Sequence, residues 1–259
     1  MLKTFTCALL ALTLGLGSCV VPSAALTPKL VRLEPDGSFG GSAPGVSSTN
    51  ELEALGISEE DETLAVGAEL KWAGARLALA TVDTSYEGSG TATVDIDFGG
   101  TPISASTPVF TRMDLALHSA RLTWDLLPTS QADLGIGVGV AVIDFDASVS
   151  SIPPAITLRT DELLPVPLVA GHVGTRWGDL ALAGDVGLFE VEFGDESARV
   201  VDVDVGLSWR FLDLPGRLGG ALVLGWRLID VDAEYEEGPS VIELDMELSG
   251  PYLGLTISI

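Results

Sequence analysis

Apolar and polar residues alternate along most of the chain. From Val201 to Phe211 every odd position is apolar, and the even positions between them carry Asp, Gly, Ser or Arg. The segments 64–72 and 134–142 show the same period of two. This period is typical of a β-strand with one apolar face, whereas an amphipathic helix repeats every 3.6 residues. The sequence therefore predicts an all-β protein.

Turn residues divide this pattern into ten segments. Short connections, as at 73–74 and 178–179, alternate with longer ones, although the loop at 194–197 is short. In the first long loop, residues 48–51 form a predicted capping box, and Gly56 is the predicted end of a single helical turn. We expect strands at about 28–40, 62–72, 75–98, 108–125, 133–149, 163–177, 180–193, 198–211, 217–235 and 241–259.

Two architectures fit ten alternating strands. A closed antiparallel transmembrane β-barrel turns its apolar faces to lipid and has short periplasmic turns and longer extracellular loops. A soluble β-sandwich or lipocalin-like barrel turns them inward. The glycines of 134–142 favour the membrane barrel, because Gly weakens a solvent-exposed strand but suits a narrow lumen. We expect about ten strands, with eight as the alternative count, and charged lumen residues at Lys71, Arg76, Asp202, Asp204, Arg210 and Arg227.

The tryptophans favour the same architecture. Four of the five lie within a few residues of a predicted short turn: Trp72, Trp124, Trp177 and Trp209. Aromatic residues gathered at one end of the strands are typical of the belt that lies at a membrane interface. Trp226 lies elsewhere, and Tyr86 and Tyr235 are the candidates for the opposite belt.

Charge is sorted between the two ends of the strands. Lys and Arg number 13 and Asp and Glu 37, so the net charge is −24, which argues against nucleic acid and against a polybasic membrane-surface patch. The basic residues beside short turns are Lys71, Arg76, Arg121, Arg176, Arg210 and Arg217, whereas carboxylates gather toward the long loops.

Carboxylates spaced two residues apart lie on one face of a strand, where their repulsion falls if a hard cation bridges them. The sequence therefore predicts weak Ca²⁺ or Mg²⁺ binding at an acidic extracellular rim, and no other cofactor. The alternative is that these residues only solvate the outer face. The candidate ligands are Asp144, Asp146, Asp230, Asp232, Asp245 and Glu247.

The N-terminus is predicted to be an export signal, since a Lys is followed by an apolar run and small residues. Residues 16–19, Leu-Gly-Ser-Cys, resemble a bacterial lipobox, which implies a signal peptide at 1–18 and lipidation of Cys19. An ordinary cleavage near residue 25 is the alternative. We expect a periplasmic linker at 19–27 and the barrel at 28–259, because no later segment offers about 20 uninterrupted apolar residues.

The chain ends in Gly-Pro-Tyr-Leu-Gly-Leu-Thr-Ile-Ser-Ile. This ending resembles the C-terminal recognition strand of bacterial outer-membrane β-barrels, and the whole pattern resembles the small OmpA-like and OmpW-like barrels. The resemblance implies a monomer in the outer membrane of a Gram-negative-type bacterium, with lipopolysaccharide, other outer-membrane lipids and the barrel-assembly machinery as partners. The residues that carry it are Tyr252, Leu253, Leu255, Ile257 and Ile259.

Enzymatic chemistry finds little support. His118 and Ser119 are similar to the His-Ser pair of lipid A deacylase barrels, but Ala120 stands where that family has Asn. A protease of the omptin kind needs a His-Asp pair near the outer mouth, and neither His118 nor His172 lies in an acidic loop. We therefore expect no catalytic residues. A structural or interaction role ranks first, a narrow passive pore for small, preferably cationic solutes second, and a lipid A-modifying enzyme last.

Overall fold

A computed structural model describes residues 22–42, 49–57, 60–96, 103–127, 131–151, 157–193, 196–214, 218–237 and 240–259. In these ranges the chain forms one antiparallel sheet, and no helix among them is long and apolar enough to cross a membrane. The strands are β1 (Ser23–Ser42), β2 (Thr49–Glu51), β3 (Asp61–Trp72), β4 (Ala75–Thr91), β5 (Pro108–Asp125), β6 (Ala132–Ser151), β7 (Thr157–Trp177), β8 (Leu180–Phe193), β9 (Glu196–Leu214), β10 (Leu218–Glu237) and β11 (Ser240–Ser258).

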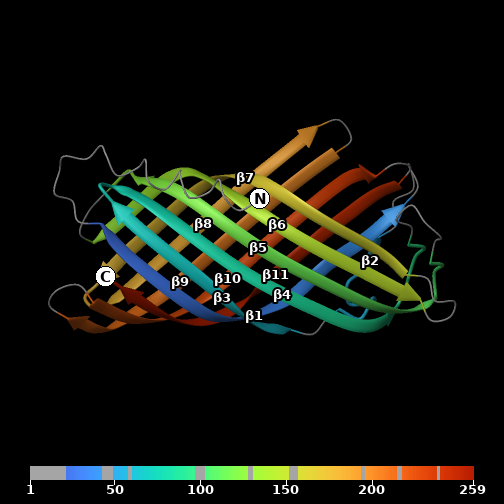
Figure 1. The fold of residues 1–259 in the computed structure, drawn as a ribbon, viewed down its shortest axis with the longest axis horizontal. Coiled ribbons are helices and arrows are strands. Elements are labelled where there is room, and N and C mark those ends of the chain that lie inside the picture. Colours follow the sequence, from blue (N-terminus) through green and yellow to red (C-terminus); the bar gives the residue numbers. More distant parts are fainter. Residues whose placement is uncertain are drawn as a thin grey trace, which may run out of the picture.

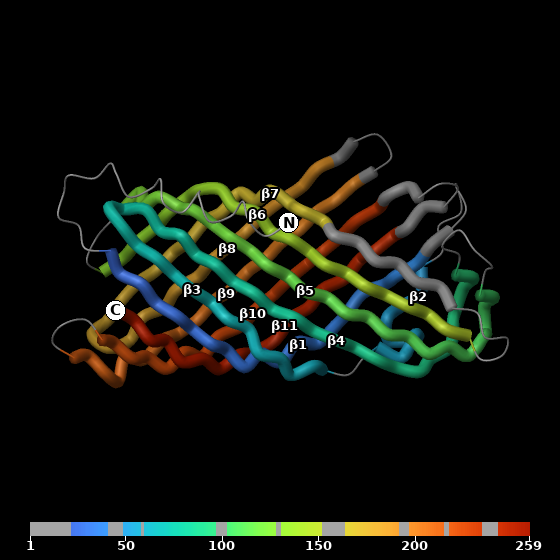
Figure 2. Tube along the Cα trace, viewed as in Figure 1, coloured from blue at the N-terminus to red at the C-terminus, as the bar shows by residue number. Residues whose placement is uncertain are grey.

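The sheet closes on itself. Each long strand pairs with the next, and β11 pairs with β1 from Ala25 opposite Ser258 to Ser42 opposite Val241. Ala24 and Ile259 exchange backbone hydrogen bonds of 3.0 and 2.8 Å at the end of this seam. Figure 1 shows the tilted strands wrapping into a barrel, and Figure 2 shows the blue β1 beside the red β11. The prediction of a closed barrel of about ten strands is confirmed, because ten long strands form the ring.

Three predicted boundaries were wrong. Strand β1 begins at Ser23, so residues 23–27 of the predicted linker are part of the barrel wall, where they pair with β3 and β11. Strand β4 ends at Thr91 rather than 98, since beyond it regular pairing gives way to an isolated Ile96–Ile103 bridge. Strand β7 begins at Thr157 rather than 163, because it is already paired with β6 from Thr157 opposite Ser150. The predicted signal peptide and Cys19 lie outside the described residues.

The short strand β2 and the turn after it fill a gap in the wall. Strand β3 begins only opposite Leu33 of β1. Further along β1, from Ser38 to Gly40, the pairing partner is β2 instead. The turn at 52–56 then reaches β4, where Thr91 N donates to Ala54 O at 2.8 Å. Gly56 ends the turn as predicted, with a φ of +89°. The capping box predicted at 48–51 was wrong over the described residues 49–51, because these pair with β1 as strand β2. A Cβ at Gly88 would lie 1.7 Å from Gly56 O, so the turn packs closely against β4. The segment 49–57 therefore bridges β1 and β4.

The barrel has two ends, which we name by their connections. The turn end carries the tight connections at 73–74 and 178–179 and the end of the β1–β11 seam where Ala24 pairs with Ile259. The loop end carries the connection between β4 and β5 and the segment 49–57. A strand of 20 residues tilted by about 45° rises about 47 Å, well above the apolar band of about 25 Å on outer-membrane barrels. The strands are therefore long enough for a second, water-facing half.

The apolar face changes sides halfway along the strands. In β6 the exposed apolar residues are the even positions from 134 to 140, and the buried ones are the odd positions from 141 to 149. In β10 the exposed even positions 222–226 are followed by buried odd positions 229–233, and β11 runs through the same change in reverse. The turn-end half thus has an apolar outside, as on a membrane barrel, and the loop-end half has an apolar inside, as in a soluble one.

The loop-end half is filled by a hydrophobic core. Phe39 and Phe145 meet there edge to face with ring centroids 6.0 Å apart. Carboxylates occupy the outer faces of the same strand segments, where they meet water. The core residues come from both sides of the ring and include Val31, Leu33, Val82, Tyr86, Met113, Leu115, Leu117, Ile143, Ile229, Val231, Met246 and Leu248.

Candidate functional site

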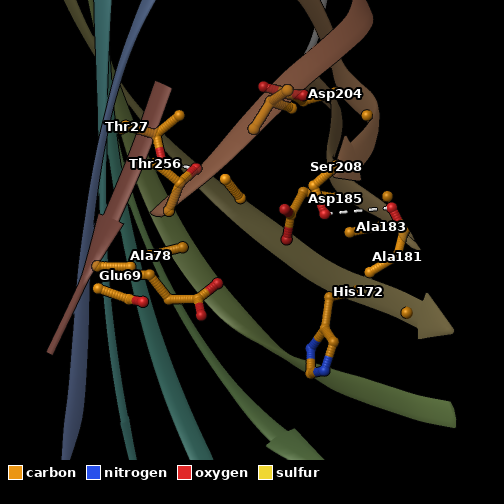
Figure 3. Close-up of a pocket in the computed structure, with 18 of the residues that line it drawn as sticks. Thr27, Glu69, Ala78, His172, Ala181, Ala183, Asp185, Asp204, Ser208 and Thr256 are labelled. Carbon is orange, nitrogen blue, oxygen red and sulfur yellow. Dashed lines mark hydrogen bonds between the residues drawn. The ribbon is translucent and has the colours of Figure 1, made fainter. Parts of the chain in front are cut away.

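The turn-end half of the lumen holds a cavity of about 680 Å³ that is lined by charged and small side chains. Ser23, Gly178, Gly219 and Ser258 line it at the turn end, and Arg121 and Arg227 line it near the hydrophobic core. Figure 3 shows acidic, hydroxyl and alanine side chains on several strands around this space, with His172 at one side. Among the described residues, the lumen is therefore a vestibule that opens at the turn end and is closed toward the loop end by apolar side chains.

Asp202 on β9 is the centre of the deepest ion cluster. Its side chain is 1% exposed and accepts hydrogen bonds from Arg121 on β5 and from Arg227 on β10, the latter at 3.0 Å. Arg227 Nη2 also lies 2.9 Å from the other carboxylate oxygen. Three charges that contact each other away from bulk water stabilise the fold only as a set, because any unpaired member would be costly.

Asp204, two residues along β9, holds a second cluster. It pairs with Lys29 on β1 and accepts a hydrogen bond of 2.6 Å from the Tyr252 hydroxyl on β11. The Lys29 ammonium lies 4.2 Å from the centroid of the Tyr252 ring, within the range of a cation–π contact. Because Gly225 faces that ring, a Cβ there would lie 2.3 Å from Tyr252 Cζ. Here glycine is required by the close approach of an aromatic side chain.

Arg76 on β4 organises the opposite wall of the vestibule. It binds both oxygens of Asp185 on β8, with Nη2 donating at 3.0 Å, and its Nε donates to Glu69 on β3 at 2.5 Å. Lys71 Nζ lies 3.3 Å from Glu69 Oε1. The charged lumen residues predicted from the sequence therefore lie inside the barrel, and each pairs with an opposite charge. Arg210 pairs at the rim with Asp179 and Asp213.

The two histidines lie in different environments. His172 is buried in the vestibule, where Nδ1 lies 3.0 Å from Thr123 Oγ1 and Nε2 lies 3.2 Å from Asp125 Oδ1. His118 is exposed on the outside of β5, with Nδ1 2.7 Å from Thr81 Oγ1, whereas Ser119 is buried on the inside. The deacylase-like pair is therefore not assembled, and neither histidine lies in the loop-end lumen.

The four tryptophans of the predicted interfacial belt lie near the turn ends of their strands, and the belt itself stays a prediction. Trp124, Trp177 and Trp209 are about half exposed near the turn ends of β5, β7 and β9, and Trp72 ends β3. The opposite belt was assigned wrongly, because Tyr86 is buried in the loop-end core. Trp226 is instead exposed where the apolar face changes sides. The side chain of Tyr235 lies outside the described residues.

The predicted acidic ligands are split between distant strands. Asp230 faces Glu247, and Asp232 faces Asp245, across β10 and β11. Asp144 and Asp146 lie on β6, which is four strands away in the ring. In the described part of the chain no three His, Cys, Asp or Glu side chains come together in a way that could hold a metal ion.

Asp245 lies on the exposed outer wall of the loop-end half, among other carboxylates. Partial burial, followed by repulsion from Asp232, Asp230 and Asp36, raises the pKa of its carboxyl. Repulsion of this kind is what a bridging cation would relieve, so weak divalent binding at this site stays a prediction.

The last strand has the orientation that the sequence predicted. Leu253, Leu255, Ile257 and Ile259 are all exposed on the outside of β11, and Tyr252 points into the lumen. Leu64 on β3 is 64% exposed on the same apolar band. Recognition of this strand by an assembly machinery stays a prediction.

No family model and no curated protein matches the chain, but solved structures do. The outer membrane protease OmpT from Escherichia coli aligns with a TM-score of 0.57 and 11% identity, over 95% of this chain and 99% of that one. The P. putida toluene transporter TodX gives a TM-score of 0.33 at 9% identity over 92% and 89%, and the translocator domain of the autotransporter NalP from Neisseria meningitidis gives 0.40 at 10% over 96% and 92%. These two scores are too low to carry an argument.

The fold is that of an outer-membrane β-barrel. The alignment with OmpT covers nearly the whole of both chains, and its low identity shows the fold alone. A closed barrel with an apolar outer band satisfies its backbone internally and matches lipid outside, as a membrane-spanning sheet must. The protein is therefore a β-barrel of the bacterial outer membrane, and short turns on such barrels face the periplasm. The finer resemblance to OmpA-like and OmpW-like barrels stays a prediction.

Proposed function

We propose that this protein is a sealed barrel with a structural or interaction role, rather than a pore or an enzyme. The observation that carries the proposal is the hydrophobic core of the loop-end half, where residues such as Leu33, Met246 and Leu248 are fully buried inside the ring. A core of fully buried apolar side chains inside the ring leaves no path for hydrated ions. The paired charges of the vestibule lie below this seal and do not replace it.

The loop-end half then serves as an acidic platform outside the cell. It carries carboxylates on its outer wall and stands well above the apolar band, so it meets lipopolysaccharide and external solutes. We also propose that the chain works as a monomer, that Cys19 carries lipid, and that the terminal strand is read by the barrel-assembly machinery. Mass spectrometry of the mature N-terminus tests the lipid, since an unmodified start near residue 25 would exclude it.

Planar-bilayer conductance of the refolded protein tests the seal. We expect the wild type to show no steady conductance. Arg76→Ala, which empties part of the vestibule without touching the hydrophobic core, should remain at the same background. Steady ohmic conductance of the wild type would replace the sealed role with the passive pore. Conductance in Arg76→Ala alone would show that the ion pairs, and not the apolar core, close the lumen.

A further inference from the structure

The vestibule contains arginine donors that the protein does not use. A guanidinium group has five N–H donors. Arg121 is 6% exposed, and the hydrogen bond found for it among the described residues runs from Nη2 to Asp202. Its Nε is buried without a partner, as is Nε of Arg227, which is 3% exposed. Buried donors of this kind need an acceptor, because leaving them unsatisfied costs their full desolvation penalty.

The acids of the vestibule are already committed to other groups. Asp202 is shared between Arg121 and Arg227, so one carboxylate faces two guanidinium groups. Asp204 is held by Lys29 and Tyr252, and its Oδ2 also lies 3.7 Å from Arg227 Nη1. Both oxygens of Asp185 are held by Arg76. No further carboxylate among the described residues pairs with Arg121, so its open donors point to an acceptor from outside the chain.

Basic residues gather in the vestibule although the protein as a whole is strongly acidic. Seven of the 13 Lys and Arg residues in the chain line the cavity, together with five acids. Asp202 behind them, and Asp213, which pairs with Arg210 at the rim, bring the acids to the same number. The vestibule is therefore balanced in charge inside a protein whose net charge is −24. The outer surface attracts cations, so an anion that enters the vestibule does so because of these local groups. The lining charges are Lys29, Lys71, Arg76, Arg121, Arg176, Arg210 and Arg227 on one side and Glu69, Asp133, Asp179, Asp185 and Asp204 on the other.

The cavity has room beside Arg121. Its volume of about 680 Å³ falls within the range of about 300–1,000 Å³ for small-molecule sites. Arg121 and Arg227 are among the residues that line this cavity, so their guanidinium groups border the space. Ala183 is exposed although it lines the lumen, and Figure 3 places it with Ala181 and Ala78 around the open space.

We propose that this vestibule binds a small anion from the periplasm, through a carboxylate or phosphate group held by Arg121 with Arg227 beside it. Arginine suits such groups because its planar fork matches a pair of anionic oxygens. The site opens at the turn end and is closed toward the loop end, so the anion enters and leaves on the periplasmic side. A free metabolite and a lipid phosphate present the same chemistry, and the test separates them. The site does not depend on the proposed seal, because a conducting barrel would keep the same arginines.

Thermal unfolding of the refolded protein in a zwitterionic detergent tests the proposal. The probes are succinate, inorganic phosphate and short-chain phosphatidic acid, each compared with sodium chloride at matched ionic strength. A probe at about ten times its Kd should raise the midpoint by about 3–5 °C in a protein of this size. A response to succinate or phosphate indicates a free anion, and a response to phosphatidic acid alone indicates a lipid headgroup.

Three variants connect the shift to the site. Arg121→Gln should abolish the shift, and Arg112→Gln, which removes an exposed arginine at the loop end, should keep it. Ala183→Phe leaves every charge in place but fills the cavity, so it should abolish the shift as well. Ala183→Phe alone decides the question if Arg121→Gln does not fold. The proposal is overturned if no probe moves the midpoint of the wild type, or if the shift in Ala183→Phe equals that of the wild type.

Discussion

Asp202→Ala is the substitution with the largest effect that the ion clusters predict. It removes the one carboxylate that Arg121 and Arg227 share, and it leaves two guanidinium groups that are more than nine-tenths buried. Removing one partner of a buried ion pair costs about 3–5 kcal/mol. The vestibule beside the cluster can supply water to the orphaned groups, so we expect the low end, about 3 kcal/mol, which is roughly a hundredfold in the folding equilibrium.

Urea unfolding and refolding in lipid vesicles, followed by tryptophan fluorescence, measures this loss. Asp213→Ala is the matched control, since Asp213 is 70% exposed and pairs with Arg210 only at the rim. An exposed pair contributes about 0–1 kcal/mol. The triple replacement of Asp202, Arg121 and Arg227 by leucine should recover much of the loss, because no buried charge is left alone. A loss below about 1 kcal/mol in Asp202→Ala would refute the view that this cluster holds the vestibule together.

Two further predictions concern the outer wall and the lumen. Because partial burial and repulsion from Asp232 raise the pKa of Asp245, its charge destabilises the folded barrel at neutral pH, and the penalty disappears as the pH falls through that pKa. Asp245→Asn should therefore raise the free energy of unfolding by about 0.2–1 kcal/mol at neutral pH and leave it unchanged in acid. Equal stability of the two proteins at neutral pH would contradict this expectation. If the rim binds calcium, adding calcium at matched ionic strength should stabilise the wild type by a similar amount. Gly225→Ala forces a methyl group against Tyr252 and should lower the free energy of unfolding by about 1–3 kcal/mol. Gly67→Ala is the control and should have little effect, because its Cβ would have no heavy atom closer than 3.7 Å. Equal unfolding midpoints for the two variants would disprove the clash.

The barrel wall could be predicted from the sequence because it depends on local patterns. Alternation at 134–142 and 201–211 identified strands and their outward faces, and turn residues gave most strand ends within a few positions. The start of β1 was missed because Pro28 and the small residues before it give a weak strand signal, although the pairing with β3 and β11 is continuous. The start of β1 is set by its pairing with these two neighbouring strands, and a local stretch of sequence carries no information about that pairing.

The change of face is visible in the sequence, but the predicted outward faces did not include it. Between Val142 and Ile143 the apolar residues of β6 move from even to odd positions, and β10 makes the same change between Leu228 and Ile229. A strand that is apolar outside along its whole length would show no such step. The interpretation of Tyr86 as a belt residue failed for this reason, because it lies beyond the step in β4.

The ion clusters could be predicted only in kind. Composition showed that the lumen would contain charges of both signs, but it could not show which ones meet. Lys29 and Asp204 are 175 residues apart, and Arg121 and Asp202 are 81 apart. Their contact crosses the lumen, and it depends on the stagger of ten strands around the ring. The donors left open on Arg121 follow from the same geometry and carry no signal in the sequence.

The step between outward and inward apolar residues also fixes how deep the barrel lies in its membrane. Trp226 marks the step on β10, and Asp230 follows it four residues later, as Glu62 precedes Leu64 on β3. A barrel that sank further would bring these carboxylates into hydrocarbon, where charged side chains are costly, and one that rose would expose the apolar band to water. The barrel therefore cannot adjust to a bilayer of the wrong thickness by moving along the membrane normal. The lipid must adapt instead, so mismatch around this protein is relieved by thinning or thickening the annulus of lipid, and the protein should favour regions whose thickness already fits.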